Sequence, residues 1–129
     1  MSTHRTYSSG FDDLVGLRMI EADGDRVVAE LFIESKHLQP GGIVHGGLYA
    51  TLVETTASVG ASLWLGPDGV AMGIANHTDF LRVVGEGRLR AEAVPVERGR
   101  TLQLWEVLVT DVQQRPIAHG KVRLMNRSA

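Results

Sequence analysis

The sequence predicts an α+β domain in which an antiparallel sheet wraps around one long central helix. Residues 46–65 are the only stretch with the apolar spacing of a long helix, and Gly66-Pro67 ends it. The stretches that follow alternate apolar and polar residues, as half-buried strands do, and short turns separate them. One helix beside consecutive strands favours a sheet that packs on that helix. The later strands are expected at residues 70–82, 88–96, 101–112 and 117–125.

The N-terminal part is expected to begin with a flexible tail, because residues 1–10 are mostly polar. Residues 11–129 then form a single domain, an ordinary length for one hydrophobic core. Within it, residues 17–33 are predicted to form two strands around an Asp-Gly turn, a pattern typical of a hairpin. Residues 36–47 are rich in glycine and contain a proline, so they are predicted to form a loop.

Composition excludes several classes of function. The net charge is −2 and no run of Lys or Arg occurs, so nucleic-acid binding is not expected. The absence of cysteine excludes disulfides and thiolate metal sites, and the five scattered His residues lack ligand spacing, so neither a metal nor another cofactor is expected. The N-terminus lacks the apolar core of a signal peptide, and Glu54 interrupts the most apolar stretch. A cytoplasmic protein without a membrane span is expected.

The predicted helix has two different faces. One is an apolar stripe that should pack on the sheet, formed by Leu48, Leu52, Thr56, Val59 and Leu63. A second face carries Glu54, the only charge in the helix, among small residues: Gly47, Ala50, Thr51, Ser58, Ala61 and Ser62. Most helical glutamates point at water, but small neighbours indicate that another backbone comes close. We therefore expect Glu54 to be partly buried at an interface.

The loop before this helix ends in His45-Gly46-Gly47. The first N–H groups of a helix have no intrahelical partner, and this end carries partial positive charge. Glycine leaves those N–H groups open to close approach, which is what stabilisation of a developing oxyanion needs. The same sequence is also compatible with a tight turn that has only a structural role.

Taken together, these motifs resemble the hot-dog thioesterases. The group with the closest pattern includes the phenylacetate-pathway, 4-hydroxybenzoyl-CoA and 1,4-dihydroxy-2-naphthoyl-CoA thioesterases. The resemblance covers residues 11–126. It is carried by Gln39, His45-Gly46-Gly47, Glu54, Ser58, residues 73–80 followed by Arg82, Arg98-Gly99-Arg100, and residues 118–122.

The resemblance implies a function and a set of catalytic residues. The chain would hydrolyse an acyl-CoA, with an aromatic acyl group among the candidates, to free acid and CoA. Glu54 would be the nucleophile or the general base that activates water, and the Gly46 amide would polarise the thioester carbonyl. His45 and Gln39 would orient the thioester and the water, and Ser58 would steady Glu54.

The remaining candidate residues would bind the substrate. By the same resemblance, Gly47, Asn76 and His77 would contact the acyl-CoA. Arg82 and Arg100 are the candidates for holding the phosphates of CoA, since guanidinium groups bind phosphate well.

The spacing of two candidates predicts a homo-oligomer, without help from the resemblance. His45 and Glu54 are nine residues apart, which is about 13.5 Å along a helix and half a turn out of phase. They cannot act on the same atom within one chain, so we expect sites shared between chains. The resemblance implies the same, as a dimer or a dimer of dimers.

Two alternatives remain open at this stage. A dehydratase acting on 3-hydroxyacyl thioesters would pair a His with an acid, and His37 precedes Glu54, but at a separation of 17 residues. A module of the same fold could instead bind acyl-CoA without turnover, because a fold does not by itself imply a function. A carboxylate facing the thioester brings no advantage to pure binding, which favours the enzyme.

Overall fold

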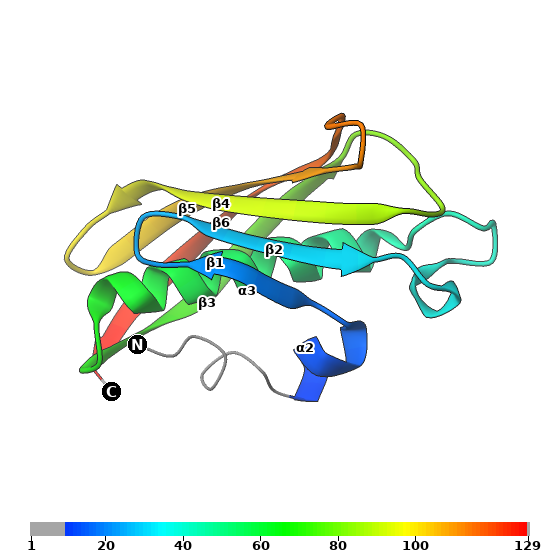
Figure 1. The fold of residues 1–129 in the computed structure, drawn as a ribbon. Helices are drawn as coiled ribbons and strands as arrows, with labels where there is room; N and C mark the ends of the chain where they lie inside the picture. Colours follow the sequence, from blue (N-terminus) through cyan, green and yellow to red (C-terminus); the bar gives the residue numbers. More distant parts are fainter. Residues whose placement is uncertain (1–9, 129) are drawn as a thin grey trace.

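The computed structural model describes residues 10–128, and in it a six-stranded antiparallel sheet curves around one long helix (Figure 1). The predicted tail, residues 1–10, lies outside the described residues except for Gly10, which begins a short helix. The elements are α2 (Gly10–Val15), β1 (Arg18–Ala22), β2 (Val27–Phe32), the 3₁₀ helix η1 (Ser35–His37), α3 (Gly46–Leu65), β3 (Gly69–Phe80), β4 (Arg88–Arg98), β5 (Leu102–Thr110) and β6 (Pro116–Ser128).

The predicted helix and strands are confirmed, with small changes at the strand ends. α3 has the predicted bounds, and the ends of β3 to β6 lie within three residues of those expected. β3 stops at Phe80 because the N–H groups of Leu81 and Arg82 both turn to the carbonyl of Ile117. The α+β class and the antiparallel sheet around a central helix are therefore as the sequence predicted.

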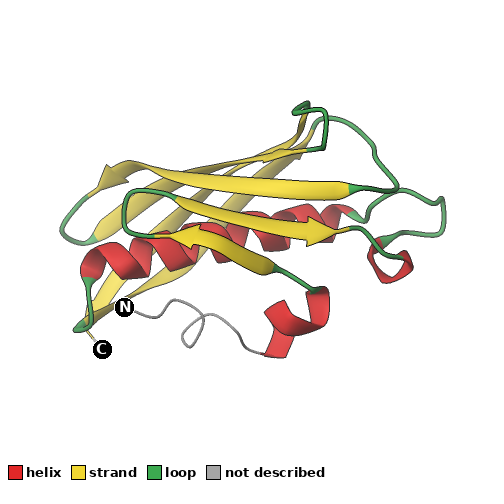
Figure 2. Cartoon of the chain, viewed as in Figure 1, coloured by secondary structure: helices red, strands yellow, loops and turns green. Residues whose placement is uncertain are grey.

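Strand order in the sheet is β1-β2-β4-β5-β6-β3. β3 directly follows α3 in the chain but pairs only with β6, at the edge opposite to β1. The helix lies along the concave face of the sheet, as Figure 2 shows. This order leaves β3 as a long edge strand beside the helix face that carries Glu54.

The predicted apolar stripe of α3 packs on the sheet, but the buried surface of the helix is wider. Leu48, Leu52, Thr56 and Val59 are buried, and Leu63 is partly buried against the same core. Because the sheet curves around the helix, it also buries Tyr49, Val53, Ala57, Gly60 and Ala61. The facing positions alternate along each strand, with Leu89, Ala91 and Ala93 from β4 and Ala118, Gly120, Val122 and Leu124 from β6.

The small-residue face of α3 lies against another stretch of backbone, as the sequence predicted. This backbone is β3 of the same chain. Ser62 Oγ accepts a hydrogen bond of 3.0 Å from the Ala71 amide, and a Cβ on Gly73 would collide with the Glu54 carboxylate. Small side chains on this face therefore allow β3 to pack against the helix, and Ala61 is fully buried.

Trp105 of β5 makes a close helix–sheet contact that depends on a glycine in α3. A Cβ on Gly60 would lie 2.6 Å from two ring atoms of Trp105. The indole N–H donates to Gln103 Oε1 at 2.7 Å, and Gln103 Nε2 donates to the Ala61 carbonyl at 3.2 Å. The buried indole is thus both packed on the helix and hydrogen-bonded, as burial of a tryptophan requires.

This contact predicts an unusual sign for a helix substitution. Alanine normally stabilises a helix interior over glycine by about 0.8–1.0 kcal/mol. At Gly60 the added methyl overpacks the core, so Gly60→Ala should lower the free energy of unfolding in urea by about 1–3 kcal/mol. Trp105→Phe removes the colliding six-membered ring, so in that background Gly60→Ala should cost less. Equal costs in both backgrounds would contradict the steric explanation.

Candidate active site

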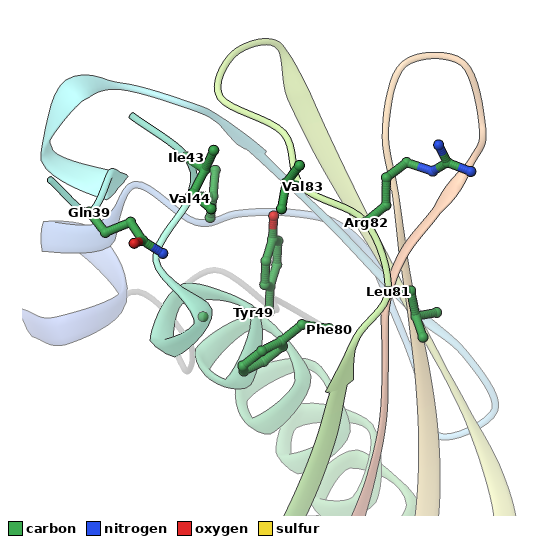
Figure 3. Close-up of a pocket in the computed structure, with 9 residues that line it drawn as sticks. Gln39, Ile43, Val44, Tyr49, Phe80, Leu81, Arg82 and Val83 are labelled. Atoms are coloured by element: carbon green, nitrogen blue, oxygen red, sulfur yellow. The ribbon is translucent and has the colours of Figure 1, made fainter. Parts of the chain in front are cut away.

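A pocket of about 320 Å³ lies at the start of α3 (Figure 3). Two parts of the chain that are distant in sequence form it: the loop before α3 with the first turn of α3, and the end of β3 with the residues after it. Backbone hydrogen bonds close the loop, from Gln39 N–H to the Ile43 carbonyl and from Val44 N–H to the Val84 carbonyl, both 2.9 Å. The lining residues are Gln39, Ile43, Val44, Gly46, Tyr49, Phe80, Leu81, Arg82 and Val83.

The helix start leaves one amide free. His45 is the N-cap, and its Nδ1 accepts a hydrogen bond of 2.8 Å from Gly47 N–H. Its carbonyl accepts from Leu48 N–H at 2.9 Å. Among the described residues, nothing accepts from Gly46 N–H, which therefore remains available at the positive end of the helix dipole. With Nδ1 accepting, the neutral His45 ring carries its proton on the exposed Nε2.

Two aromatic rings form one wall of the pocket beside this amide. A Cβ on Gly46 would lie 2.5 Å from Cε2 of Phe80, so the Phe80 ring covers the glycine at close range. The rings of Tyr49 and Phe80 are tilted by 46° with centroids 5.8 Å apart, a favourable aromatic arrangement. Glycine at position 46 is thus required by packing as well as by access to its amide.

Tyr49 has a buried hydroxyl without a partner. The residue is 3% exposed, and its oxygen makes no hydrogen bond within residues 10–128. Burial raises the pKa of Tyr49, so the hydroxyl keeps its proton. A buried hydroxyl without a hydrogen-bond partner typically lowers the free energy of unfolding by about 1–3 kcal/mol. Burial of the apolar ring of Tyr49 does not remove this penalty.

A second cluster of polar side chains surrounds Glu54, next to β3. Its Oε1 accepts a hydrogen bond of 3.1 Å from Asn76 Nδ2, and Ser58 Oγ lies 3.4 Å from its Oε2. Asn76 Nδ2 also donates to the Ala50 carbonyl at 3.1 Å. Thr78 Oγ1 donates to Asn76 Oδ1 at 2.7 Å, so the amide has its donor side turned toward Glu54. The carboxylate is therefore half-buried and held in one orientation.

An irregularity in β3 decides which residues reach Glu54. The register with β6 shifts between Gly73 and Ala75, so the side chains change faces there. Beyond the shift Asn76 faces the helix and His77 faces away from it. The His77 side chain is 80% exposed and its Nε2 lies 3.2 Å from Asp79 Oδ1.

The structure brings most, but not all, of the predicted site residues together. Gln39, Gly46 and Arg82 line the pocket, and Ser58 and Asn76 surround Glu54. His45 caps the start of the helix, and the Gly47 amide donates to its side chain as part of this cap. Within one chain His77 and Arg100 lie elsewhere: His77 on the outer face of β3, and Arg100 in the β4–β5 turn, at the other end of α3 (Figure 1).

The sequence analysis missed several residues of these two groups, three of which bear on the chemistry. Tyr49 and Phe80 are pocket walls, and Thr78 orients the amide of Asn76. A signal existed for Tyr49, since it is the only tyrosine in the helix and lies one turn after Gly46. No pattern in the sequence could show that Phe80, from a distant strand, covers that glycine.

The dehydratase alternative depended on His37, and this residue is engaged elsewhere. Its side chain is buried, Nδ1 accepts from Glu34 N–H at 2.9 Å, and Nε2 lies 2.6 Å from the Val15 carbonyl. Both ring nitrogens therefore hold backbone groups together, and neither is free for proton transfer. His37 stabilises the link between α2 and the loop.

Two further findings limit the chemistry of the described residues. Across residues 10–128, no three His, Asp or Glu side chains come together in a way that could hold a metal ion. No helix in this part of the chain is long and apolar enough to cross a membrane. The two groups offer the half-buried Glu54 carboxylate, which can take part in acid–base chemistry, and a free helix amide beside an apolar pocket.

Comparison with known proteins gives consistent matches. A sequence model of the thioesterase superfamily matches residues 41–118. A Mycobacterium tuberculosis protein provisionally named an esterase is 42% identical over 122 residues, which cover 92% of this chain and 87% of that protein. The 1,4-dihydroxy-2-naphthoyl-CoA hydrolase of Listeria monocytogenes is 28% identical over 106 residues, 82% of this chain and 86% of the hydrolase.

Solved structures agree with these sequence matches. The structure of the M. tuberculosis protein has a TM-score of 0.90 at 42% identity and covers 92% of this chain and 97% of its own. A thioesterase from Haemophilus influenzae has a TM-score of 0.92 over 97% of this chain and 87% of its own. At 24% identity, this second likeness bears on the fold alone.

Proposed function

Since the chain belongs to the thioesterase superfamily, we propose that it hydrolyses acyl-CoA thioesters to a free acid and CoA. It has the hot-dog fold and is a thioester hydrolase. The Listeria relative, whose name gives an acyl-CoA as substrate, supports CoA as the thiol. The observation that carries the proposal is the unpaired Gly46 amide beside a pocket of a size suited to an acyl group.

In the proposed mechanism the thioester carbonyl oxygen accepts a hydrogen bond from Gly46 N–H. Negative charge that develops on this oxygen is stabilised by the amide and by the positive end of α3. Glu54 either takes a proton from the attacking water or attacks the carbonyl carbon itself. The C–S bond then breaks, and the CoA sulfur leaves as a thiolate that takes up a proton. Where water attacks, the acid forms directly; where Glu54 attacks, water then hydrolyses the acyl–Glu54 anhydride, which releases the acid and restores the carboxylate.

The hydrogen bonds around Glu54 support its role. Asn76 fixes one carboxylate oxygen, and Ser58 lies near the other. Neither donor carries a charge, so both orient the carboxylate without forming an ion pair with it. In this proposal Gln39 and His45, at the pocket and the helix start, orient the thioester and the water.

We further propose that each site is shared by two chains. Nine residues of helix separate His45 from Glu54, about 13.5 Å of rise, so one chain cannot supply both to the same carbonyl. β3 supports pairing of chains, because it is a 12-residue edge strand without lysine or proline to block addition of another strand. Two β3 edges side by side would continue the sheet, in a dimer or a dimer of dimers.

The pocket offers separate places for the acyl group and for CoA. Its lining is mostly apolar, with Ile43, Val44, Phe80 and Val83, which suits an acyl chain or an aromatic ring. Arg82 is exposed at the rim and would hold a phosphate of CoA. His77 and Arg100 lie away from this pocket, so their contact with substrate would require a partner chain. Gly47 is next to the pocket, but its amide is used by the His45 cap.

Glu54→Gln should lower kcat at least about a hundredfold on an acyl-CoA substrate, the lower range for loss of a general base. The amide keeps the shape and can still accept from Asn76, so the fold and the oligomer size should persist. Glu106→Gln is the matched control, since Glu106 pairs with His119 away from the site and its variant should stay active. Wild-type turnover by Glu54→Gln would remove Glu54 from the mechanism.

Gly46→Val should depress kcat by about a hundredfold or more, as loss of one oxyanion donor does elsewhere. The added side chain also displaces Phe80, so the effect must be separated from that movement. Gly46→Val combined with Phe80→Ala provides the separation in a steady-state assay. If the double variant recovers the activity of Phe80→Ala alone, displacement of Phe80 explains the loss, and the prediction that the valine blocks access to the Gly46 amide is wrong.

Inactive His45→Ala and Glu54→Gln chains should restore activity when they are unfolded and refolded together. In a mixed dimer with shared sites, one site receives both changes and the other receives neither. Random mixing then gives about a quarter of wild-type activity, because half of the dimers are mixed and each has one intact site. Subunit exchange is verified by native mass spectrometry, and an exchanged but inactive mixture would contradict site sharing.

A further inference from the structure

Tyr49 lines the pocket but has no role in the proposed mechanism. Its hydroxyl oxygen is buried and has no hydrogen-bond partner within residues 10–128. The residue nevertheless lines the same pocket as Gly46. We propose that Tyr49 is a specificity-determining residue, whose hydroxyl forms a hydrogen bond with an oxygen substituent on the acyl group. This inference rests on the proposed function, because it assumes that the pocket holds the acyl group.

The position of Tyr49 suits such a contact. It follows Gly46 by three residues, so both face the same side of the helix. With the thioester carbonyl at the Gly46 amide, the acyl group extends along the Tyr49 and Phe80 rings. Figure 3 shows the Tyr49 hydroxyl pointing away from Phe80 and toward Val83. The hydroxyl therefore meets the part of the acyl group that is distant from the thioester.

The surroundings of the hydroxyl are otherwise apolar. Ile43, Val44 and Val83 line this end of the pocket, and their side chains can neither donate nor accept a hydrogen bond. A hydrocarbon acyl group would leave the hydroxyl unpaired, whereas a hydroxyl or oxo group would pair with it. Because burial raises the pKa of Tyr49, the hydroxyl remains protonated and can donate as well as accept.

Access to the hydroxyl requires only a small movement. Val83 lies next to it and belongs to the segment between β3 and β4. The Val83 side chain is 68% exposed, so it can turn toward solvent without leaving a cavity in the core. A pocket of about 320 Å³ is at the small end for ligand sites, which suits one ring or a short chain. The substrate class is thus an acyl-CoA whose acyl group is small and carries a hydroxyl or oxo group distant from the thioester.

Matched substrate pairs test this role. The pairs are benzoyl-CoA against 3- and 4-hydroxybenzoyl-CoA, and hexanoyl-CoA against 6-hydroxyhexanoyl-CoA. In at least one pair the wild type should favour the hydroxylated member about fivefold to tenfold in kcat/KM, the usual value of one hydrogen bond. Tyr49→Phe should remove that preference, because its kcat/KM should fall on the hydroxylated substrate and stay unchanged on the other. The Tm of this variant should not fall. Phe80→Leu is the matched control, and it should lower kcat/KM equally on both substrates of a pair.

The outcomes separate this inference from the proposed function. Hydrolysis without a preference in any pair, or a preference that survives Tyr49→Phe, overturns the role of Tyr49 and leaves the thioesterase function intact. If the wild type hydrolyses none of these thioesters, the proposed function fails for this substrate range. Calorimetry with thioether analogues of the same pairs then decides: a preference lost in Tyr49→Phe supports the contact, and equal affinities overturn it.

Discussion

Burial of α3 in the curved sheet is the constraint on which the rest of the structure depends. Large apolar side chains on this helix are each worth about 1.5–3 kcal/mol when removed from water, and the helix carries most of its length inside the core. The apolar positions lie along the whole helix, so its full length packs on the sheet. This placement brings the helix start next to the loop at residues 38–45 and to the end of β3. The pocket forms where these three segments meet.

Close packing around the helix is made possible by missing side chains. Gly60 admits the ring of Trp105, and Gly120 lies where a Cβ would be 2.5 Å from Val53. Gly73 admits the carboxylate of Glu54 in the same way. Two of these glycines serve packing alone, whereas the third creates room for a charged group beside a strand. The same physical device therefore serves both stability and the candidate site.

The chemistry of the site comes from groups that the fold leaves unpaired. A helix start has more N–H groups than local partners, and the His45 cap satisfies that of Gly47 but not that of Gly46. One turn later the hydroxyl of Tyr49 is buried without a partner. Most buried polar groups in proteins are paired, so two unpaired groups in one pocket distinguish it from ordinary core.

The sequence by itself determined the elements that rest on local signals. The bounds of α3 follow from the His-Gly-Gly start and the Gly-Pro end, and the inward faces of β4 and β6 follow from strict alternation. Contacts between distant residues were decided only by the tertiary structure. The small-residue face of α3 pairs with β3 of the same chain, because β3 crosses to the far edge of the sheet. An irregularity at Gly73–Ala75 then exchanges the faces of β3, so Asn76 meets Glu54 and His77 faces outward. Alternation has a period of two, and one extra residue reverses every position after it.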